Sequence, residues 1–476
     1  MLPLLFRKER FAPASARSLC RKGGTKMKFE ALEKVGAMSL LSPWGQNMHL
    51  PAGIFHWSGR AKAEAEINGT IGTAKGKAQQ VFGTGGDKKV TMALPSMKKY
   101  IPNLDPEQIF PYAPDKGLPA FSSAWRNWIL RKAGEQAKRL DPILGECQVT
   151  PGITGGLHNT LKLFVAQGDP VVVPDKRWEN YDNIIEINLG GKPAEFPFFS
   201  GDRFNIDGMC DAIRSVWKRQ DRAVLILNFP NNPTGYSPPR AEAEAIKNSL
   251  LELTASGNKW LVVIFDDAYE GYVYDPGAAN RSLFYEMLPQ KGLVTIKLDG
   301  ISKEMLWYGG RVGTITMAYP PDWVSAVGRN ALDKEWGNKF AGISRSTYSN
   351  CSMVAQSVAA AALQDMDQIL EERKVCIGIL AERYRIFKEE LKKIDTTRLQ
   401  CNPFQGGFFN FFDIVPKDGP SAEDMADHLL KKYKTGTIPV HFGSLNGIRV
   451  AFCSVEAEDI PRLCDNLNNA AKDLMP

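Results

Sequence analysis

Short apolar runs alternate with helix-length amphipathic stretches from about residue 145 to residue 320. Each run is apolar at successive positions, which is typical of strands in a mostly parallel sheet that helices cover on both faces. The pattern therefore predicts a large α/β domain. The predicted strands are 170–175, 223–229, 260–266, 293–299 and 311–318, and the clearest helices between them are 156–168 and 241–257.

The pattern changes toward the C-terminus. A long helical region at 353–394 precedes an apolar run at 406–414, a charged helix at 421–433 and a short strand at 447–453. Strands and helices in this order are typical of a smaller α+β domain. We expect three parts after the first 26 residues: an N-terminal segment (27–100) that lies partly in the small domain, a large domain (101–345) and the small domain (346–476).

The net charge of +6 is located in residues 1–26, which hold seven Lys and Arg residues and one acid, Glu9. The remaining chain is balanced, so nothing favours nucleic acid as a partner. A second methionine, Met27, leaves three explanations open for the basic segment: a mis-called start, a disordered extension or a transit peptide. No stretch approaches the ~18 consecutive apolar residues of a spanning helix, so we expect no membrane association.

The eight cysteines are scattered without a CxxC pair, and the five histidines are equally dispersed. Buried free thiols in a reducing cytosol explain this cysteine pattern better than disulfides or zinc. The sequence therefore predicts a cytoplasmic protein without a metal site.

Polar residues gather where the predicted strands end. Asp266-Asp267-Ala268-Tyr269 follows one strand, and Gly300-Ile301-Ser302-Lys303 follows the next, with Arg311 shortly after it. Asn232 lies in the sequence PNNPTG after a third strand, and a glycine-rich turn at 153–157 opens a helix. Because ligands of open α/β sheets bind beyond the carboxyl ends of the strands, these residues are expected to form one site.

These motifs (FPNNPTG at 229–235, DxAY at 266–269 and SKxxxxxxxRxG at 302–313) resemble those of class I/II aminotransferases of pyridoxal-5′-phosphate (PLP) fold type I, in that family's order. The resemblance is strongest to the aspartate aminotransferase branch and covers nearly all of the chain after residue 60. It implies a mostly parallel seven-stranded sheet in the large domain. It also implies PLP as cofactor and amino-group transfer between an amino acid and a 2-oxo acid.

By this resemblance, Lys303 forms the Schiff base with PLP and later moves the proton, which requires an accessible neutral amine. Asp266 would pair with the pyridine nitrogen, whereas alternation along the chain would point Asp267 elsewhere. Tyr269 and Asn232 would hydrogen-bond the phenolic oxygen. Trp178 would stack on the ring, with Tyr181 the other aromatic candidate.

The cofactor's phosphate requires backbone amides at a helix start and a fixed positive charge. The resemblance assigns Gly155, Gly156 and Leu157 to the amides and Arg311 to the charge. Gly300 stands where many relatives have Ser or Thr, so Ser302 is expected to contribute more. Tyr112 would reach the phosphate of a neighbouring subunit, which implies a homodimer with shared sites.

Arg449 matches the arginine that holds the substrate α-carboxylate, and the Gly72 backbone would face the same group. Arg345, in ISRSTYSN, resembles the arginine by which a partner subunit selects aspartate and glutamate. Three alternatives to dicarboxylate transfer remain: an aromatic or broad-specificity aminotransferase, a PLP-dependent lyase or decarboxylase, and a PLP-sensing module fused to a DNA-binding domain. The balanced charge and short N-terminal segment disfavour the last.

Overall fold

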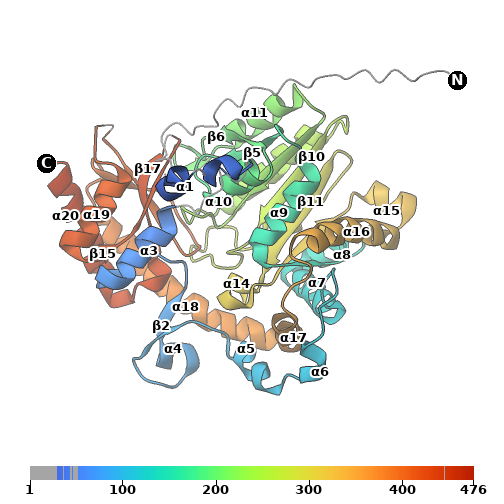
Figure 1. The fold of residues 1–476 in the computed structure, drawn as a ribbon, viewed down its shortest axis with the longest axis horizontal. Coiled ribbons are helices and arrows are strands. Elements are labelled where there is room, and N and C mark those ends of the chain that lie inside the picture. The colour runs from blue at the N-terminus through green and yellow to red at the C-terminus, as the bar shows by residue number, and fades with distance from the viewer. Residues whose placement is uncertain (1–28, 36, 43–45, 47–51, 417, 444) are drawn as a thin grey trace.

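The structure is a computed structural model that describes residues 29–476, apart from residues 36, 43–45, 47–51, 417 and 444. The basic segment 1–26 lies outside the described residues. In Figure 1 a large sheet with helices on both faces forms one part of the molecule, and a smaller group of strands and helices near the C-terminus forms the other. Within the described ranges, no helix is long and apolar enough to cross a membrane.

The large sheet has seven strands in the order β4-β12-β11-β10-β9-β5-β6. All pairs are parallel except those of β12, which runs antiparallel to β11 and β4. The predicted mostly parallel sheet is therefore confirmed. Its strands are β4 (Gln148–Thr150), β5 (Pro170–Pro174), β6 (Lys192–Phe196), β9 (Arg222–Leu227), β10 (Trp260–Asp266), β11 (Leu293–Gly300) and β12 (Gly313–Ala318).

Alternate residues of these strands enter two separate hydrophobic cores, as the period of two in a strand requires. Leu225 and Val263 belong to a core with side chains of α11 and α12, whereas Ile226 and Ile264 belong to a core with side chains of α9 and α16. Burial on both faces explains why each strand is a continuous apolar run. The helices are α9 (Gly152–Phe164), α11 (Ile206–Trp217), α12 (Arg240–Thr254) and α16 (Arg329–Thr347).

A third core lies in the smaller part, under an antiparallel sheet with the order β13-β14-β17-β16. Helix α20 packs against α18 and α19, and α3, from the N-terminal third, packs against β16. The elements are β13 (Leu399–Cys401), β14 (Asn410–Ile414), β16 (Ile438–Phe442), β17 (Leu445–Val450), α3 (Ala52–Glu64), α18 (Met366–Glu390), α19 (Ala422–Tyr433) and α20 (Ile460–Leu474).

Shorter elements connect the two parts and cover their edges, and α17 (Met353–Ala362) packs on α5 (Pro95–Tyr100) and α7 (Pro119–Ala133). The others are α1 (Glu30–Lys34), η1 (Ala37–Leu40), β1 (Ile67–Asn68), β2 (Lys75–Lys77), α4 (Ala78–Phe82), β3 (Lys89–Thr91), η2 (Ile101–Asn103), α6 (Pro106–Ile109), η3 (Gly134–Gln136), α8 (Ala137–Leu140), α10 (Asn180–Asp182), η4 (Asn183–Asn188), β7 (Phe199–Ser200), β8 (Arg203–Phe204), α13 (Leu283–Glu286), α14 (Ile301–Glu304), η5 (Tyr308–Gly310), α15 (Pro321–Val327), η6 (Leu391–Lys393), β15 (Thr435–Gly436), η7 (Phe452–Ser454) and η8 (Ala457–Asp459).

Candidate active site

The carboxyl edge of the large sheet brings the predicted polar residues together with the small sheet. Asp266 ends β10, and Lys303 lies in α14 directly after β11. Arg449, on β17 of the small sheet, donates a hydrogen bond to Oδ1 of Asn232 over 3.1 Å. The site therefore lies where the two parts of the molecule meet, at the strand ends of the large sheet.

Lys303 is half-buried and has no carboxylate partner among the described residues. Its Nζ donates to the backbone oxygen of Gly72 over 3.1 Å and lies 4.8 Å from the centre of the Tyr308 ring and 6.0 Å from that of Tyr269. Among the described residues no acid forms an ion pair with it. Burial lowers the pKa of Lys303 from 10.5 to about 8, and the nearby Arg311 acts in the same direction. A neutral amine is therefore accessible near neutral pH.

Asp266 is 3% exposed, and Oδ2 accepts a hydrogen bond from the hydroxyl of Tyr181 over 2.5 Å. Burial raises the pKa of Asp266 to about 6, and the hydrogen bond from Tyr181 opposes this rise. Trp178 is half-buried and meets Tyr181 edge to face at 5.7 Å. Sequence reasoning considered Tyr181 only as a stacking ring. The structure instead makes it the donor that stabilises the ionised form of Asp266.

Arg449 is 5% exposed and has no carboxylate partner among the described residues. Besides Asn232, it donates to the backbone oxygen of Thr70 over 3.2 Å, and its guanidinium lies 4.3 Å from the centre of the Phe409 ring. Its Nε has no hydrogen-bond partner, and burial lowers the pKa of the group. A buried, incompletely satisfied guanidinium is suited to a carboxylate ligand.

Gly72 completes the same wall of the site. A Cβ at this position would lie 2.4 Å from the ring of Phe409, so a side chain would displace that ring from beneath Arg449. Tyr269 also packs against this ring, with the two ring centres 5.7 Å apart. Burial raises the pKa of Tyr269, which therefore keeps its proton at neutral pH. The backbone oxygen of Gly72 accepts the hydrogen bond from Lys303 Nζ.

A cradle suited to a phosphate lies at the N-terminus of α9. The helix begins at Gly152, so the amides without helical partners are those of Gly152, Ile153 and Thr154. The expectation of Gly155, Gly156 and Leu157 is corrected by one turn, because those residues lie inside the helix. Gly152 has φ +73°, and a Cβ there would lie 2.5 Å from the Arg311 guanidinium.

Arg311 supplies the fixed charge beside this helix start. It donates to Oγ of Ser302 over 3.3 Å and to the backbone oxygen of Tyr308 over 3.4 Å. Both expected side chains, Arg311 and Ser302, therefore lie together at the N-terminus of α9. An arginine fork and free helix amides are a combination that binds anions.

Two expected site residues lie apart from this centre in the single chain. Tyr112 follows α6 and is 89% exposed. Arg345 is exposed near the end of α16 and donates to Oγ of Ser349 over 2.6 Å. Neither contacts Lys303 or Arg449 within the described chain. Any role in binding would require a second subunit.

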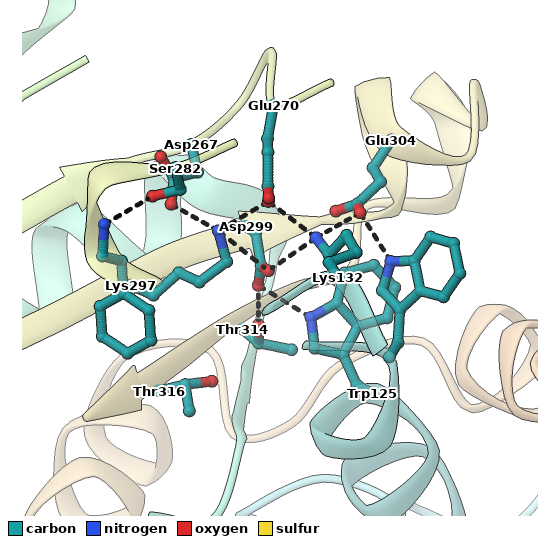
Figure 2. Close-up of polar contacts among 12 residues, drawn as sticks. Trp125, Lys132, Asp267, Glu270, Ser282, Lys297, Asp299, Glu304, Thr314 and Thr316 are labelled. Atoms are coloured by element: carbon teal, nitrogen blue, oxygen red, sulfur yellow. Dashed lines mark hydrogen bonds and ion pairs between the residues drawn. The ribbon is translucent and has the colours of Figure 1, made fainter. Parts of the chain in front are cut away.

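Charged residues also gather around Asp267 and Glu304, the residues that follow Asp266 and Lys303 in sequence (Figure 2). Asp267 contacts Nζ of Lys297, and Glu304 lies 2.5 Å from Nζ of Lys132. The alternation that pointed Asp267 away from Asp266 is therefore seen in the structure. Neither Lys132 nor Lys297 was predicted to belong to a charged cluster.

Three carboxylates of this cluster, from Glu270, Asp299 and Glu304, have oxygens within 4.8 Å of one another, a spacing that can hold a metal ion. The ammonium group of Lys132 lies among them, 2.7 Å from Glu270 and 3.8 Å from Asp299. The structure therefore already provides a cation at this place.

The seven described cysteines are free, and six of them are buried.

Comparisons with known proteins agree with the geometry. A family model described as aminotransferase class I and II matches residues 84–467. An aspartate aminotransferase of Sulfolobus acidocaldarius is 27% identical over 68% of this chain and 75% of its own. Aromatic-amino-acid aminotransferase 2 of Thermococcus litoralis is 25% identical over 71% and 81%. The solved structure of an aminotransferase from Anaerococcus prevotii matches with a TM-score of 0.75 and 25% identity, over 92% of this chain and 100% of its own.

Proposed function

Because this chain belongs to the class I and II aminotransferase family, whose members are PLP-dependent transferases, we propose that it moves the amino group of an L-amino acid to a 2-oxo acid by a ping-pong mechanism. The single observation that carries the proposal is the presence in one site of two cations without an acid partner among the described residues, the half-buried Lys303 and the buried Arg449. The Lys303 amine is suited to react with a carbonyl group, and the Arg449 guanidinium is suited to bind a carboxylate.

The residues present fit PLP at each of its polar groups. When bound, PLP supplies a carbonyl that condenses with amines and a ring that accepts electrons. The α9 N-terminus, Arg311 and Ser302 would hold the phosphate, and Asp266 would pair with the ring nitrogen. Tyr269 and Asn232 would face the phenolic oxygen, and Trp178 would cover the ring.

Lys303 has two tasks in this proposal: it holds the cofactor and then carries a proton at its Nζ. A pKa near 8 suits the second task, because a proton carrier works best when its pKa lies near the operating pH. The hydrogen bond to the oxygen of Gly72 keeps Nζ directed into the site. Tyr269 lies beside the same nitrogen and, because it stays protonated, can donate a hydrogen bond.

Arg449 binds the α-carboxylate of the substrate in this proposal. Its Nε and its two terminal nitrogens form a planar fork, and the unpartnered Nε is available for a second contact. Burial in the site strengthens the pairing and gives the substrate a fixed orientation. The amino group of the substrate would then lie toward Lys303.

Aspartate or glutamate is the proposed amino donor, with the distal carboxylate bound by Arg345 of a second copy of the chain. This proposal is supported by the names of several relatives, including the Sulfolobus protein. The exposure of Arg345 and Tyr112 fits residues that act across a dimer interface. The Thermococcus litoralis relative favours an aromatic donor as the second candidate.

Half-reactions followed by the absorbance of the bound cofactor distinguish these donors. Aspartate, tyrosine and alanine are each added to purified holoenzyme, and to the Arg345→Ala variant. The dicarboxylate proposal expects aspartate to react fastest, and expects the variant to lose rate with aspartate but not with alanine. Faster reaction with tyrosine, together with an unchanged aspartate rate in the variant, would refute it.

A further inference from the structure

A chain of buried charges links the residue after Asp266 to the residue after Lys303 (Figure 2). Nζ of Lys297 contacts Asp267 and lies 2.8 Å from Oε2 of Glu270. The same Glu270 oxygen lies 2.7 Å from Nζ of Lys132, which in turn lies 2.5 Å from Glu304. Glu270 is therefore shared by both lysines, and the chain of contacts is continuous.

The charges of this chain depend on one another. Four acids, counting Asp299, face two ammonium groups, and every one of these acids is at most 5% exposed. Oδ2 of Asp299 and Oε2 of Glu304 already lack a hydrogen-bond partner. Removing either lysine would leave buried carboxylates without their nearest cation, which is strongly unfavourable.

The backbone around Lys303 is held by the same region. The guanidinium of Arg373 donates to the backbone oxygen of Glu304 and, over 3.0 Å, to that of Glu270. The hydroxyl of Tyr272 donates to the backbone oxygen of Lys303 over 2.7 Å. Nε1 of Trp128 donates to Oε1 of Glu304 over 2.6 Å. Side chains behind the site therefore fix the short helix α14 that presents Lys303.

We propose that the contact chain Asp267–Lys297–Glu270–Lys132–Glu304 is a positioning device that holds Asp266 and Lys303 at a fixed separation, with Lys132 and Lys297 as its positioning residues. Each reactive residue has a neighbour in sequence, Asp267 or Glu304, whose carboxylate contacts a lysine of the chain. The device rests on the proposed function, since the separation it fixes is the one between the two residues that hold PLP.

A charge-balanced double variant separates positioning from the stability of buried charges. Lys132→Met alone leaves Glu270 and Glu304 without their shared cation, so the apoprotein should unfold at a lower temperature. Lys132→Met with Glu304→Gln removes one positive and one negative charge, and the amide oxygen still accepts from Trp128. Its apoprotein should recover most of the unfolding temperature, while the contact between the two strand ends stays broken.

The decisive readouts are the dissociation constant of PLP, titrated into apoprotein, and the pH at which the absorbance of bound PLP changes. If the chain positions Lys303, the double variant binds PLP at least about tenfold more weakly and has a shifted absorbance midpoint, and its kcat falls by up to about a hundredfold. Tyr319→Phe is the matched control, because it deletes a buried hydroxyl that donates to Asp333 over 2.8 Å, away from both strand ends. It should change neither readout.

A double variant with wild-type PLP affinity and an unshifted absorbance midpoint would overturn the proposal, and the chain would then contribute to stability alone. If Lys132→Met does not fold, the double variant still decides the question. Wild-type apoprotein that takes up no PLP would refute the proposed function and this proposal with it. Wild-type uptake combined with an unaltered double variant would refute only the positioning role.

Discussion

Two lysines of the same segment, Lys297 and Lys303, show how the two sides of a strand end differ. Lys297, in β11, is completely buried, and Asp267, Glu270 and Asp299 surround its ammonium group. These acids raise its pKa despite the burial. Lys303, just past the end of β11, has no acid beside it, and burial lowers its pKa to about 8.

Burial alone therefore does not decide what a charged residue does. On the far side of the strand ends, Lys132 and Lys297 contact buried carboxylates directly, and burial raises the pKa of Asp267 to about 7. On the near side, Lys303 and Arg449 keep unused hydrogen-bonding capacity that a ligand can take up. Asp266 and Asp267 repeat the contrast, because Asp266 accepts from a tyrosine whereas Asp267 pairs with an ammonium group.

The largest expected effects come from removing each of the two lysines in turn. Lys303→Ala should abolish the absorbance of bound PLP and all amino-group transfer, while the apoprotein stays as stable as wild type. Lys297→Met should instead destabilise the apoprotein by about 3–5 kcal/mol, because the buried Asp267 loses its cation and Glu270 and Asp299 each lose one of two. Absorbance spectra and denaturant unfolding measure both effects. Normal turnover of Lys303→Ala would contradict the comparison.

Arg449 gives the next largest effect. Arg449→Met should lower kcat/KM for every amino-acid donor by roughly a hundredfold or more, because a buried charge-assisted contact to the α-carboxylate is lost. Steady-state kinetics with aspartate and alanine measure the loss, and Arg449→Lys should recover only a small part because it lacks the planar fork. A loss of kcat/KM that is confined to aspartate would show that Arg449 binds the side-chain carboxylate of aspartate instead.

The sequence predicted the reactive side of the strand ends better than the supporting side. Strands that are apolar on both faces reveal their ends clearly, so Asp266, Lys303 and Asn232 could be placed together by topology. Lys297 did leave a signal, because a charged residue inside a fully apolar strand needs buried partners. Lys132 left none, since a lysine on a helix is ordinarily solvated and its partners come from distant segments.

Two local details required the three-dimensional structure. The pair Gly155–Gly156 suggested the turn before α9, but the helix begins at Gly152, whose positive φ and contact with Arg311 exclude a side chain. Tyr181 was a candidate for stacking because aromatic residues pack in many ways. Its hydroxyl partner, Asp266, comes from another strand and cannot be found by spacing.

A smaller effect should appear in the pH dependence of apoprotein stability. The pKa of Asp266 is raised from 3.8 to about 6 in the fold, so the folded state binds this proton more tightly than the unfolded state. Its contribution to stability is complete below pH 3.8 and is lost as the pH rises through 6. The unfolding free energy of wild type minus that of Asp266→Asn should therefore fall by about 2 kcal/mol between pH 4 and 7. A difference that rises over this range would contradict the assigned burial.

The smallest effect tests the hydrogen bond from Tyr181 that favours the ionised form of Asp266 despite its burial. Because the Tyr181 hydroxyl lowers the pKa of Asp266, Tyr181→Phe should raise that pKa further above 6 and reduce the ionised fraction near neutral pH. PLP affinity should fall by about tenfold at pH 6, and the loss should shrink toward pH 8, where Asp266 is ionised in both proteins. Tyr236→Phe is the control, because it deletes a hydroxyl that donates over 2.5 Å to a different buried acid, Glu242. A loss of affinity that is equal at all pH values would mean that Tyr181 supports the ring of Trp178 rather than the charge of Asp266.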